Sequence, residues 1–461
     1  MRQRKHLEKW HPGYALLKRY VNLVFRLYFK NIRIRGKGHI PHNAPVILAP
    51  NHQNALMDAL AVLYAYRGQP VFIARADIFK KKILARILTF LKLMPVYRIR
   101  DGYDSLQNNE RVMDQVSSIL SHHRTLVIFP EGNHGYKRNL RPLKKGICRM
   151  AFQAEERNNF KLGLFIVPVG LDYENYYKFQ RSLMVNFGEP IAVDPLNSLY
   201  QENPSKAHNL LKAKIAEGLK KVMLQIGHPE YYAMIDFLRE IYRPNMKQWL
   251  NLKKISYPER LWADRQLVKI MDDQINKKPE EAEALNNHVM TLKKYLRRLH
   301  FRPWIFQKKH YSKGKLVAQI PLLIVLFPLF FYGLINNAIP FFLPSAITRK
   351  VKDPQFYSSI RNGMAIVLFP LFYGVQLVIF HAFVHGGWLS AGYLISLPLT
   401  GYFAYHYYRI ARKILARVRY NVFSRRKRKM FDHIHQLQGS ILQKVDEWVS
   451  TYQSSYTMHD H

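Results

Sequence analysis

A buried strand, a turn and a helix are encoded in direct succession by Ala44-Pro-Val-Ile-Leu-Ala-Pro-Asn-His-Gln-Asn-Ala-Leu-Met-Asp-Ala-Leu60. The apolar run up to Ala49 is typical of a buried strand, and residues 55–65 are helix formers without Gly or Pro. Asn54 is a suitable helix cap, which predicts that His52 lies in the turn and Asp58 in the first turns of the helix. A His oriented by a carboxylate can act as a general base toward a hydroxyl group. His52 and Asp58 are therefore candidate catalytic residues.

The spacing of the two residues limits how they can meet. Asp58 follows His52 by six positions, which on an unbroken α-helix corresponds to about 600° of rotation and leaves the two on different faces. They can interact only if His52 precedes the helix or if the turn bulges. Because the chain contains 20 His, the pair needs support from the rest of the sequence.

Three later blocks give that support: Pro95-Val-Tyr-Arg-Ile-Arg-Asp101, Ile128-Phe-Pro-Glu-Gly-Asn-His134 with Pro142-Leu-Lys-Lys-Gly146, and Ile166-Val-Pro-Val-Gly-Leu171. Over roughly residues 15 to 200, their order and spacing resemble the glycerol-phosphate and lysophosphatidate acyltransferase superfamily. The family usually has His-x4-Asp where this chain has His-x5-Asp, and Thr-Arg where this chain has Asn133-His134. Some branches, including fungal enzymes that acylate glycerol 3-phosphate, look similar in both respects. The resemblance therefore indicates a variant branch.

The resemblance implies transfer of a fatty acyl group from an acyl thioester to a hydroxyl of a glycerol phosphate or lysophospholipid. His52 would take the hydroxyl proton and Asp58 would hold its ring in the useful tautomer. Arg98 matches the family's phosphate-binding Arg, and Arg100 would share its face of a strand. Glu131 would accept a hydrogen bond from a glycerol hydroxyl. The full set of expected substrate-binding residues is Asn51, Arg98, Arg100, Pro130, Glu131 and Gly132.

Further expectations follow from the same resemblance. Pro168, like Pro130, would shape a turn beside the site. Lys144 and Lys145 are candidates for phosphate or carrier contacts, although two surface Lys are usually only solvated. The sequence contains no recognisable metal site, dinucleotide loop or Walker loop, so we expect no cofactor beyond the donor, acyl-CoA or acyl-carrier-protein.

The charge of the chain indicates an anionic partner. Lys and Arg total 71 against 31 Asp and Glu, a formal net charge of +40. A nucleic acid or the phosphate surface of a membrane would match this excess. The sequence has no zinc-finger or RNP-like signature, and its basic runs flank apolar segments, which favours a phospholipid membrane and no nucleic acid. The single cysteine, Cys148, excludes an intramolecular disulfide and is expected in the core.

Strand-like and helix-like stretches alternate in the first 200 residues, which predicts an α/β layered domain. We expect a catalytic domain at 1–204, a charged helical region at 205–310, a transmembrane region at 311–408 and a basic helical tail at 409–461. The first domain would include a basic amphipathic helix from Tyr14 to Phe29. That helix fits a membrane surface and an ordinary packed surface helix equally well.

Three apolar runs, 316–335, 364–385 and 388–408, each have about the length that crosses a bilayer. Basic segments at 293–315, 349–361 and 409–429 flank them. If all three basic segments face the cytoplasm, the chain forms two hairpins, which turn near Asn336-Asn337 and Gly386-Gly387. We therefore expect an integral membrane protein with a cytoplasmic catalytic domain.

The sequence leaves several alternatives open. The acceptor is glycerol 3-phosphate, lysophosphatidate, dihydroxyacetone phosphate or another lysolipid. The acyl length and the choice between coenzyme A and carrier protein are equally open. A rival function is a non-catalytic protein that binds or anchors to membrane lipid and keeps the fold after His52 and Asp58 have lost their alignment.

Overall fold

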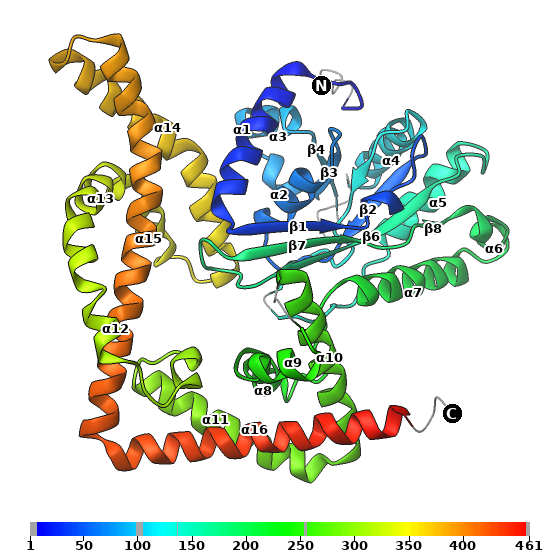
Figure 1. Cartoon of the computed structure of the whole chain (residues 1–461). Helices are drawn as coiled ribbons and strands as arrows, with labels where there is room; N and C mark the ends of the chain where they lie inside the picture. The colour runs from blue at the N-terminus through cyan, green and yellow to red at the C-terminus, as the bar shows by residue number, and fades with distance from the viewer. Residues whose placement is uncertain (1–6, 98–104, 136, 253–255, 458–461) are drawn as a thin grey trace. The chain divides into compact units, whose positions relative to one another are not determined.

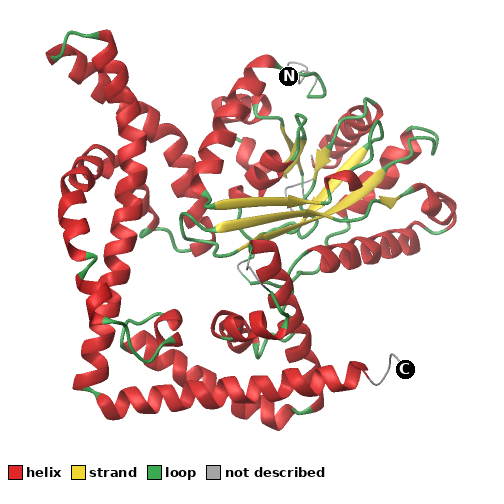
Figure 2. Ribbon diagram, viewed as in Figure 1, coloured by secondary structure: helices red, strands yellow, loops and turns green. Residues whose placement is uncertain are grey.

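The computed structural model describes residues 7–97, 105–135, 137–252 and 256–457. The chain divides into two compact units, 1–225 with 348–363, and 226–347 with 364–461. The first unit contains an eight-stranded sheet in the order β1-β7-β6-β2-β5-β3-β4, with β8 paired to β6. All neighbouring strands are parallel except β7 and β8, which run antiparallel to β6. Helices cover the sheet, as expected for an α/β layered domain (Figures 1 and 2).

The elements of the first unit, in chain order, are α1 (Pro12–Tyr28), β1 (Asn31–Arg35), η1 (Lys37–His39), β2 (Val46–Pro50), α2 (Leu56–Ala65), β3 (Val71–Arg75), η2 (Ala76–Phe79), α3 (Lys82–Phe90), β4 (Leu93–Val96), α4 (Ser105–Ser121), β5 (Leu126–Val127), α5 (Gly146–Arg157), β6 (Phe165–Tyr173), β7 (Ser182–Phe187), β8 (Ile191–Ala192), η4 (Asp194–Leu196), α6 (Asn197–Glu202) and α7 (Pro204–Val222). The strand and helix expected around His52 are β2 and α2.

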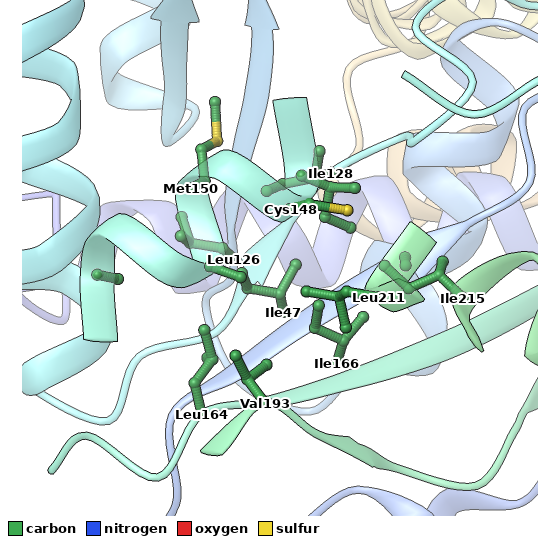
Figure 3. Close-up of a cluster of buried hydrophobic side chains, with 14 of the residues drawn as sticks. Ile47, Leu126, Ile128, Cys148, Met150, Leu164, Ile166, Val193, Leu211 and Ile215 are labelled. Carbon is green, nitrogen blue, oxygen red and sulfur yellow. The ribbon is translucent and has the colours of Figure 1, made fainter. Parts of the chain in front are cut away.

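Strand β2 shows how the sheet is buried on both faces. Ile47 and Ala49 belong to a core cluster shared with α4, α5 and α7, whereas Val46 and Leu48 belong to a second cluster shared with α1 and α2. Because successive side chains of a strand point to opposite faces, a continuous apolar run is what a strand covered on both sides requires. Figure 3 shows part of the first cluster, which includes the buried Cys148. The expectation that this cysteine is a core residue is confirmed.

The first unit extends beyond residue 204, where the sequence placed the end of the catalytic domain. Helix α7 buries Leu211, Ile215 and Leu219 completely in the cluster shared with α4 and α5. Its charged residues, which gave the segment the character of a separate region, occupy the opposite side of the helix. The boundary therefore moves to Gln225.

Residues 348–363, here called the inserted segment, also belong to the first unit. The segment contains η6 (Pro354–Phe356) and the first turns of α14 (Tyr357–Phe383). It is folded on itself, because Arg361 donates from Nε and Nη2 to Thr348 Oγ1 at 3.3 and 3.2 Å. The sequence analysis treated these residues as a basic loop between apolar helices.

The second unit is helical. Besides the rest of α14 it comprises α8 (Tyr232–Ile241), α9 (Arg243–Trp249), α10 (Tyr257–Lys277), α11 (Pro279–Arg298), η5 (Pro303–Gln307), α12 (Lys313–Val317), α13 (Ile320–Thr348, its last residue excepted), α15 (Gly387–Arg426) and α16 (Arg428–Thr457). Helix α16 buries Ile434, Ile441 and Trp448.

The turn expected at Asn336-Asn337 is wrong, because both residues lie within α13. Each side-chain amide donates to the carbonyl four residues earlier, Tyr332 O and Gly333 O, both at 2.9 Å. Asn337 also donates to Leu397 O at 3.0 Å and accepts from the Tyr373 hydroxyl at 2.6 Å. These bonds satisfy the polar groups that had suggested a turn.

Among the described helices, two stretches are long and apolar enough to cross a membrane, Lys313–Thr348 and Pro354–Phe383. The sequence analysis expected a third at 388–408. That run is part of α15, a 40-residue helix whose tyrosines and polar residues lower its hydropathy and whose second half is basic. The expected joint at Gly386-Gly387 is present between α14 and α15.

Candidate active site

The turn between β2 and α2 brings His52 and Asp58 together. His52 precedes the helix, as its spacing requires, and its Nδ1 lies 2.9 Å from Asp58 Oδ2. The Asp58 side chain is completely buried, whereas the His52 side chain is 16% exposed. With Nδ1 facing the carboxylate, Nε2 is the ring nitrogen that remains for a substrate proton.

The Asp58 carboxylate organises the whole turn. Its Oδ2 accepts the backbone N–H of Gln53 at 2.8 Å and that of Asn54 at 2.6 Å, and its Oδ1 accepts the Tyr173 hydroxyl at 2.7 Å. Burial and the neighbouring carboxylate raise the pKa of Tyr173 well above its ordinary value, so the hydroxyl stays a donor. Donors on several sides hold the carboxylate in one orientation, which in turn fixes the His52 ring.

The turn between His52 and Asp58 is strained at Ala55. Ala55 is the N-cap of α2 and has φ 45° and ψ −124°, a backbone conformation that residues with a side chain rarely adopt. The prediction that Asn54 caps the helix is therefore wrong. The Asn54 side chain instead donates to Tyr176 O at 3.3 Å and accepts from the Ser358 hydroxyl at 2.6 Å.

The Glu131 carboxylate stabilises this turn through hydrogen bonds. Its Oε1 accepts the His52 backbone N–H at 2.7 Å, and its Oε2 accepts Arg141 Nε at 2.8 Å. Burial raises the pKa of Glu131, and these hydrogen bonds and the Arg141 charge oppose the rise. Arg141 also donates from Nη2 to His52 O at 3.2 Å. Glu131 was expected to bind a glycerol hydroxyl, but its carboxylate is 0% exposed and oriented toward these protein groups.

The wall beside His52 comes from the chain after β5. The Phe129 ring stacks on the His52 ring with centroids 4.1 Å apart, and the His134 ring meets it edge-on at 5.5 Å. Gly132 has φ 72°, and a Cβ there would lie 3.1 Å from Lys144 Cγ. The turn therefore favours glycine at this position.

The remaining residues expected at or beside the site are Asn51, Pro130, Lys144, Lys145 and Pro168. Asn51 is completely buried, and its side chain pairs with the backbone of Leu171, accepting at 2.6 Å and donating at 3.3 Å. It ties β2 to β6 and has no exposed surface for a substrate, contrary to its assignment to substrate binding. Pro130 O accepts the Lys144 N–H at 2.8 Å, and Pro168 lies within β6. The side chains of Lys144 and Lys145 are exposed.

Arg98 and Arg100 lie outside the described residues, so their predicted contacts stay predictions. Strand β4, which ends at Val96 just before them, is parallel to β3, β5 and β2. Parallel strands present their carboxyl ends at one edge of the sheet, and ligands of open α/β sheets bind along that edge. His52 follows β2 at this same edge.

Sequence reasoning did not find Tyr173, Arg141, Phe129 or the inserted segment. Phe129 stood in a recognised block, and Arg141 directly precedes Pro142 of the same block, so their position was a usable signal. Tyr173 is two residues beyond the last block. Nothing local connects the inserted segment with a turn 300 residues earlier. Among the described residues, no group of three or more His, Cys, Asp or Glu could hold a metal ion.

The part of the chain that carries His52 and Asp58 matches a known protein family. Residues 31–172 match the family model described as Acyltransferase. They are a domain of the acyltransferase family, as the motifs indicated.

Named relatives cover the same part of the chain. Glycerol-3-phosphate O-acyltransferase 1 of Saccharomyces cerevisiae is 29% identical over 161 residues, which are 34% of this chain and 20% of the yeast protein. The human 1-acyl-sn-glycerol-3-phosphate acyltransferase alpha is 26% identical over 153 residues, 33% of this chain and 49% of the human protein. The matches thus span less than half of these relatives. The solved 1-acyl-sn-glycerophosphate acyltransferase of Thermotoga maritima covers 47% of this chain and 83% of its own, with 19% identity and a TM-score of 0.32.

Proposed function

We propose that this protein transfers a fatty acyl group from an acyl thioester to a hydroxyl of a glycerol phosphate or lysophospholipid at a phospholipid membrane. The observation that carries the proposal is the 2.9 Å pair of His52 Nδ1 and the buried Asp58. The relatives' names, which include glycerol-3-phosphate and 1-acylglycerol-3-phosphate acyltransferases, support the substrate class.

In the proposed reaction, His52 Nε2 takes the proton of the acceptor hydroxyl as its oxygen attacks the thioester carbonyl carbon. The resulting oxyanion collapses, the carbon–sulfur bond breaks, and the imidazolium returns the proton to the departing thiolate. Asp58 keeps the ring oriented and stabilises its charged form. Because the thioester is already activated, no acyl-enzyme and no cofactor beyond the donor are needed.

Glu131 and Arg141 act in this proposal by holding the backbone of His52 in place. We expect Arg98, or Arg100 as the second choice, to bind the acceptor phosphate. The rival function, a lipid-binding protein without activity, rested on a loss of alignment between His52 and Asp58. The 2.9 Å contact between His52 Nδ1 and Asp58 Oδ2 favours catalysis over this rival.

The test is acyl transfer by the full chain in membranes, with labelled acyl-CoA and acyl-carrier-protein and the four acceptors named above. We expect a labelled lipid from at least one acceptor and a loss of roughly 10²- to 10⁴-fold in rate for His52→Ala. His122→Ala is a matched control, because His122 is exposed beyond the end of α4. A His52→Ala variant with the wild-type rate, or no transfer to any acceptor, would contradict the proposal.

A further inference from the structure

The inserted segment, residues 348–363, interacts directly with the turn that carries His52. Ser358 Oγ donates to Asn54 Oδ1 at 2.6 Å, and Ser359 Oγ donates to Asn54 O at 3.2 Å. Ser358 is completely buried, Ser359 is 6% exposed and Asn54 is 1% exposed. Buried polar atoms are costly to leave unpaired, so these bonds constrain both partners.

Asn54 connects the segment to the candidate catalytic pair. Its backbone N–H donates to Asp58 Oδ2 at 2.6 Å, the same oxygen that faces His52 Nδ1. One residue thus receives hydrogen bonds from the inserted segment and passes one on to Asp58. The strained backbone of Ala55 follows immediately. A strained turn persists only where its surroundings determine it, and the two serines supply part of that determination.

A second set of contacts joins the inserted segment to His134, which lies beside His52, and to the chain after β6. His134 Nδ1 is hydrogen-bonded to Gln355 Oε1, and the His134 and Phe356 rings are 4.7 Å apart at 82°. His134 in turn meets the His52 ring edge-on. Arg361 Nη1 donates to Tyr177 O at 3.3 Å, in the chain that follows β6. The segment therefore contacts the chain after β2, after β5 and after β6.

We propose that the inserted segment is a positioning element of the active site, and that Ser358 and Ser359 are positioning residues that act through Asn54 on Asp58 and His52. This inference rests on the proposed function for its kinetic consequence, but its structural consequence is independent of the reaction. The segment joins the two apolar stretches Lys313–Thr348 and Pro354–Phe383 and includes the last residue of the first and the first ten of the second. The residues that join the two candidate membrane-spanning stretches thus also make contacts that orient His52.

The test compares Ser358→Ala, Ser359→Ala and the double variant with the wild type. We expect the double variant to lower kcat by about 10- to 100-fold, because a displacement of about 1 Å at a reacting group has effects of this order. The KM values of both substrates should stay close to those of the wild type, since neither serine touches substrate. Ser359→Thr keeps the hydroxyl, so unlike Ser359→Ala it should retain the wild-type rate. Ser121→Ala is the matched control, because Ser121 is exposed at the end of α4 and its hydroxyl donates to Ser118 O.

A double-mutant cycle tests the route through Asn54. If Ser358 acts only through Asn54, Ser358→Ala should cost nothing further in an Asn54→Ala background. Additive losses would overturn the proposed route.

Amide hydrogen exchange of residues 51–58 gives a readout that does not depend on activity. The N–H groups of Gln53 and Asn54 are bonded to Asp58, so loosening the turn should speed their exchange in the double variant and not in Ser121→Ala. Unchanged exchange together with unchanged kcat would overturn the inference. Faster exchange in a protein that transfers no acyl group would leave the positioning role standing and contradict only the proposed function.

Discussion

At the scale of single residues, Asp58 is the centre of the site. It receives hydrogen bonds from the His52 ring, from the two backbone N–H groups that follow His52 and from Tyr173. A carboxylate can accept all of these bonds, whereas an amide presents only one acceptor oxygen. The residue therefore combines two tasks, shaping the turn and selecting the His52 tautomer.

Asp58→Asn is accordingly expected to lower kcat by roughly 10²- to 10⁴-fold, because the amide can favour the wrong His52 tautomer. The measurement is steady-state acyl transfer with the preferred acceptor. Tyr173→Phe is the comparison variant, since it removes one bond to Asp58 and leaves the His52 contact in place. We expect its loss to be much smaller. Wild-type turnover in Asp58→Asn would mean that another group orients His52.

A second prediction at this scale concerns Arg98 and the binding of the acceptor. Arg98→Ala should raise the KM of the phosphate-bearing acceptor far more than that of the acyl donor, since a charge-assisted contact of about 1.5–3 kcal/mol would be lost. Kinetics with each substrate varied in turn measures the two effects. A similar rise in both KM values would remove Arg98 from phosphate binding.

At the scale of elements, the sequence predicted the strand and helix around His52 but not the contacts that distant residues make with the turn between them. The apolar run of β2 and the helix formers of α2 are local patterns, and they predicted the strand and the helix on either side of His52. The role of Asn54 could not be read in the same way. Its choice between capping α2 and binding Ser358 depends on a segment 300 residues away, which no local pattern reveals.

The same limit applies to Glu131. Its motif suggested a substrate ligand, but motif matching does not show whether a carboxylate is buried. Only the fold shows that Arg141 and the His52 backbone occupy its oxygens. Similarly, the charged residues of α7 suggested a separate region, although the apolar residues on one side of this helix belong to the core of the first unit.

The turn between β2 and α2 yields a prediction about Ala55. Ala55 has a positive φ, so Ala55→Gly should keep or slightly raise stability, whereas the β-branched Ala55→Val should lose about 1–3 kcal/mol. Denaturant unfolding of the two variants measures the difference. Deleting Gln53, which would restore the commoner spacing, should impair activity, because its N–H donates to Asp58 and its side chain accepts from the Tyr176 hydroxyl. Equal stability of the Gly and Val variants would contradict the strained turn.

At the scale of the whole molecule, the inserted segment constrains the topology. Residues 1–225 and 348–363 form one compact unit, so they lie on one side of any membrane. The chain between them must therefore cross an even number of times. Within the described part of that interval, Lys313–Thr348 is the one stretch long and apolar enough to cross. A single passage is incompatible with an even number.

Helix α13 is suited to entering and leaving a membrane on the same side. At 29 residues it is about 43 Å long if straight, and it contains Pro328, Pro340 and Pro344. Proline removes a backbone hydrogen bond and bends a helix, so α13 can turn without the loop that was expected at Asn336-Asn337. With this arrangement we still expect the basic segments 293–315 and 349–361 to lie on one side of the membrane.

Cysteine labelling in sealed vesicles tests this topology. Burial raises the pKa of Cys148 to about 11, so its thiol is unreactive near neutral pH and the native cysteine can be kept. Lys161→Cys, Lys309→Cys and Lys352→Cys, at exposed positions, should all react from one side. Gly387→Cys should react from the other side, because α14 separates it from the inserted segment. Labelling of Lys309→Cys and Lys352→Cys from opposite sides would show that α13 crosses once, and the inserted segment could then not be part of the unit that carries His52.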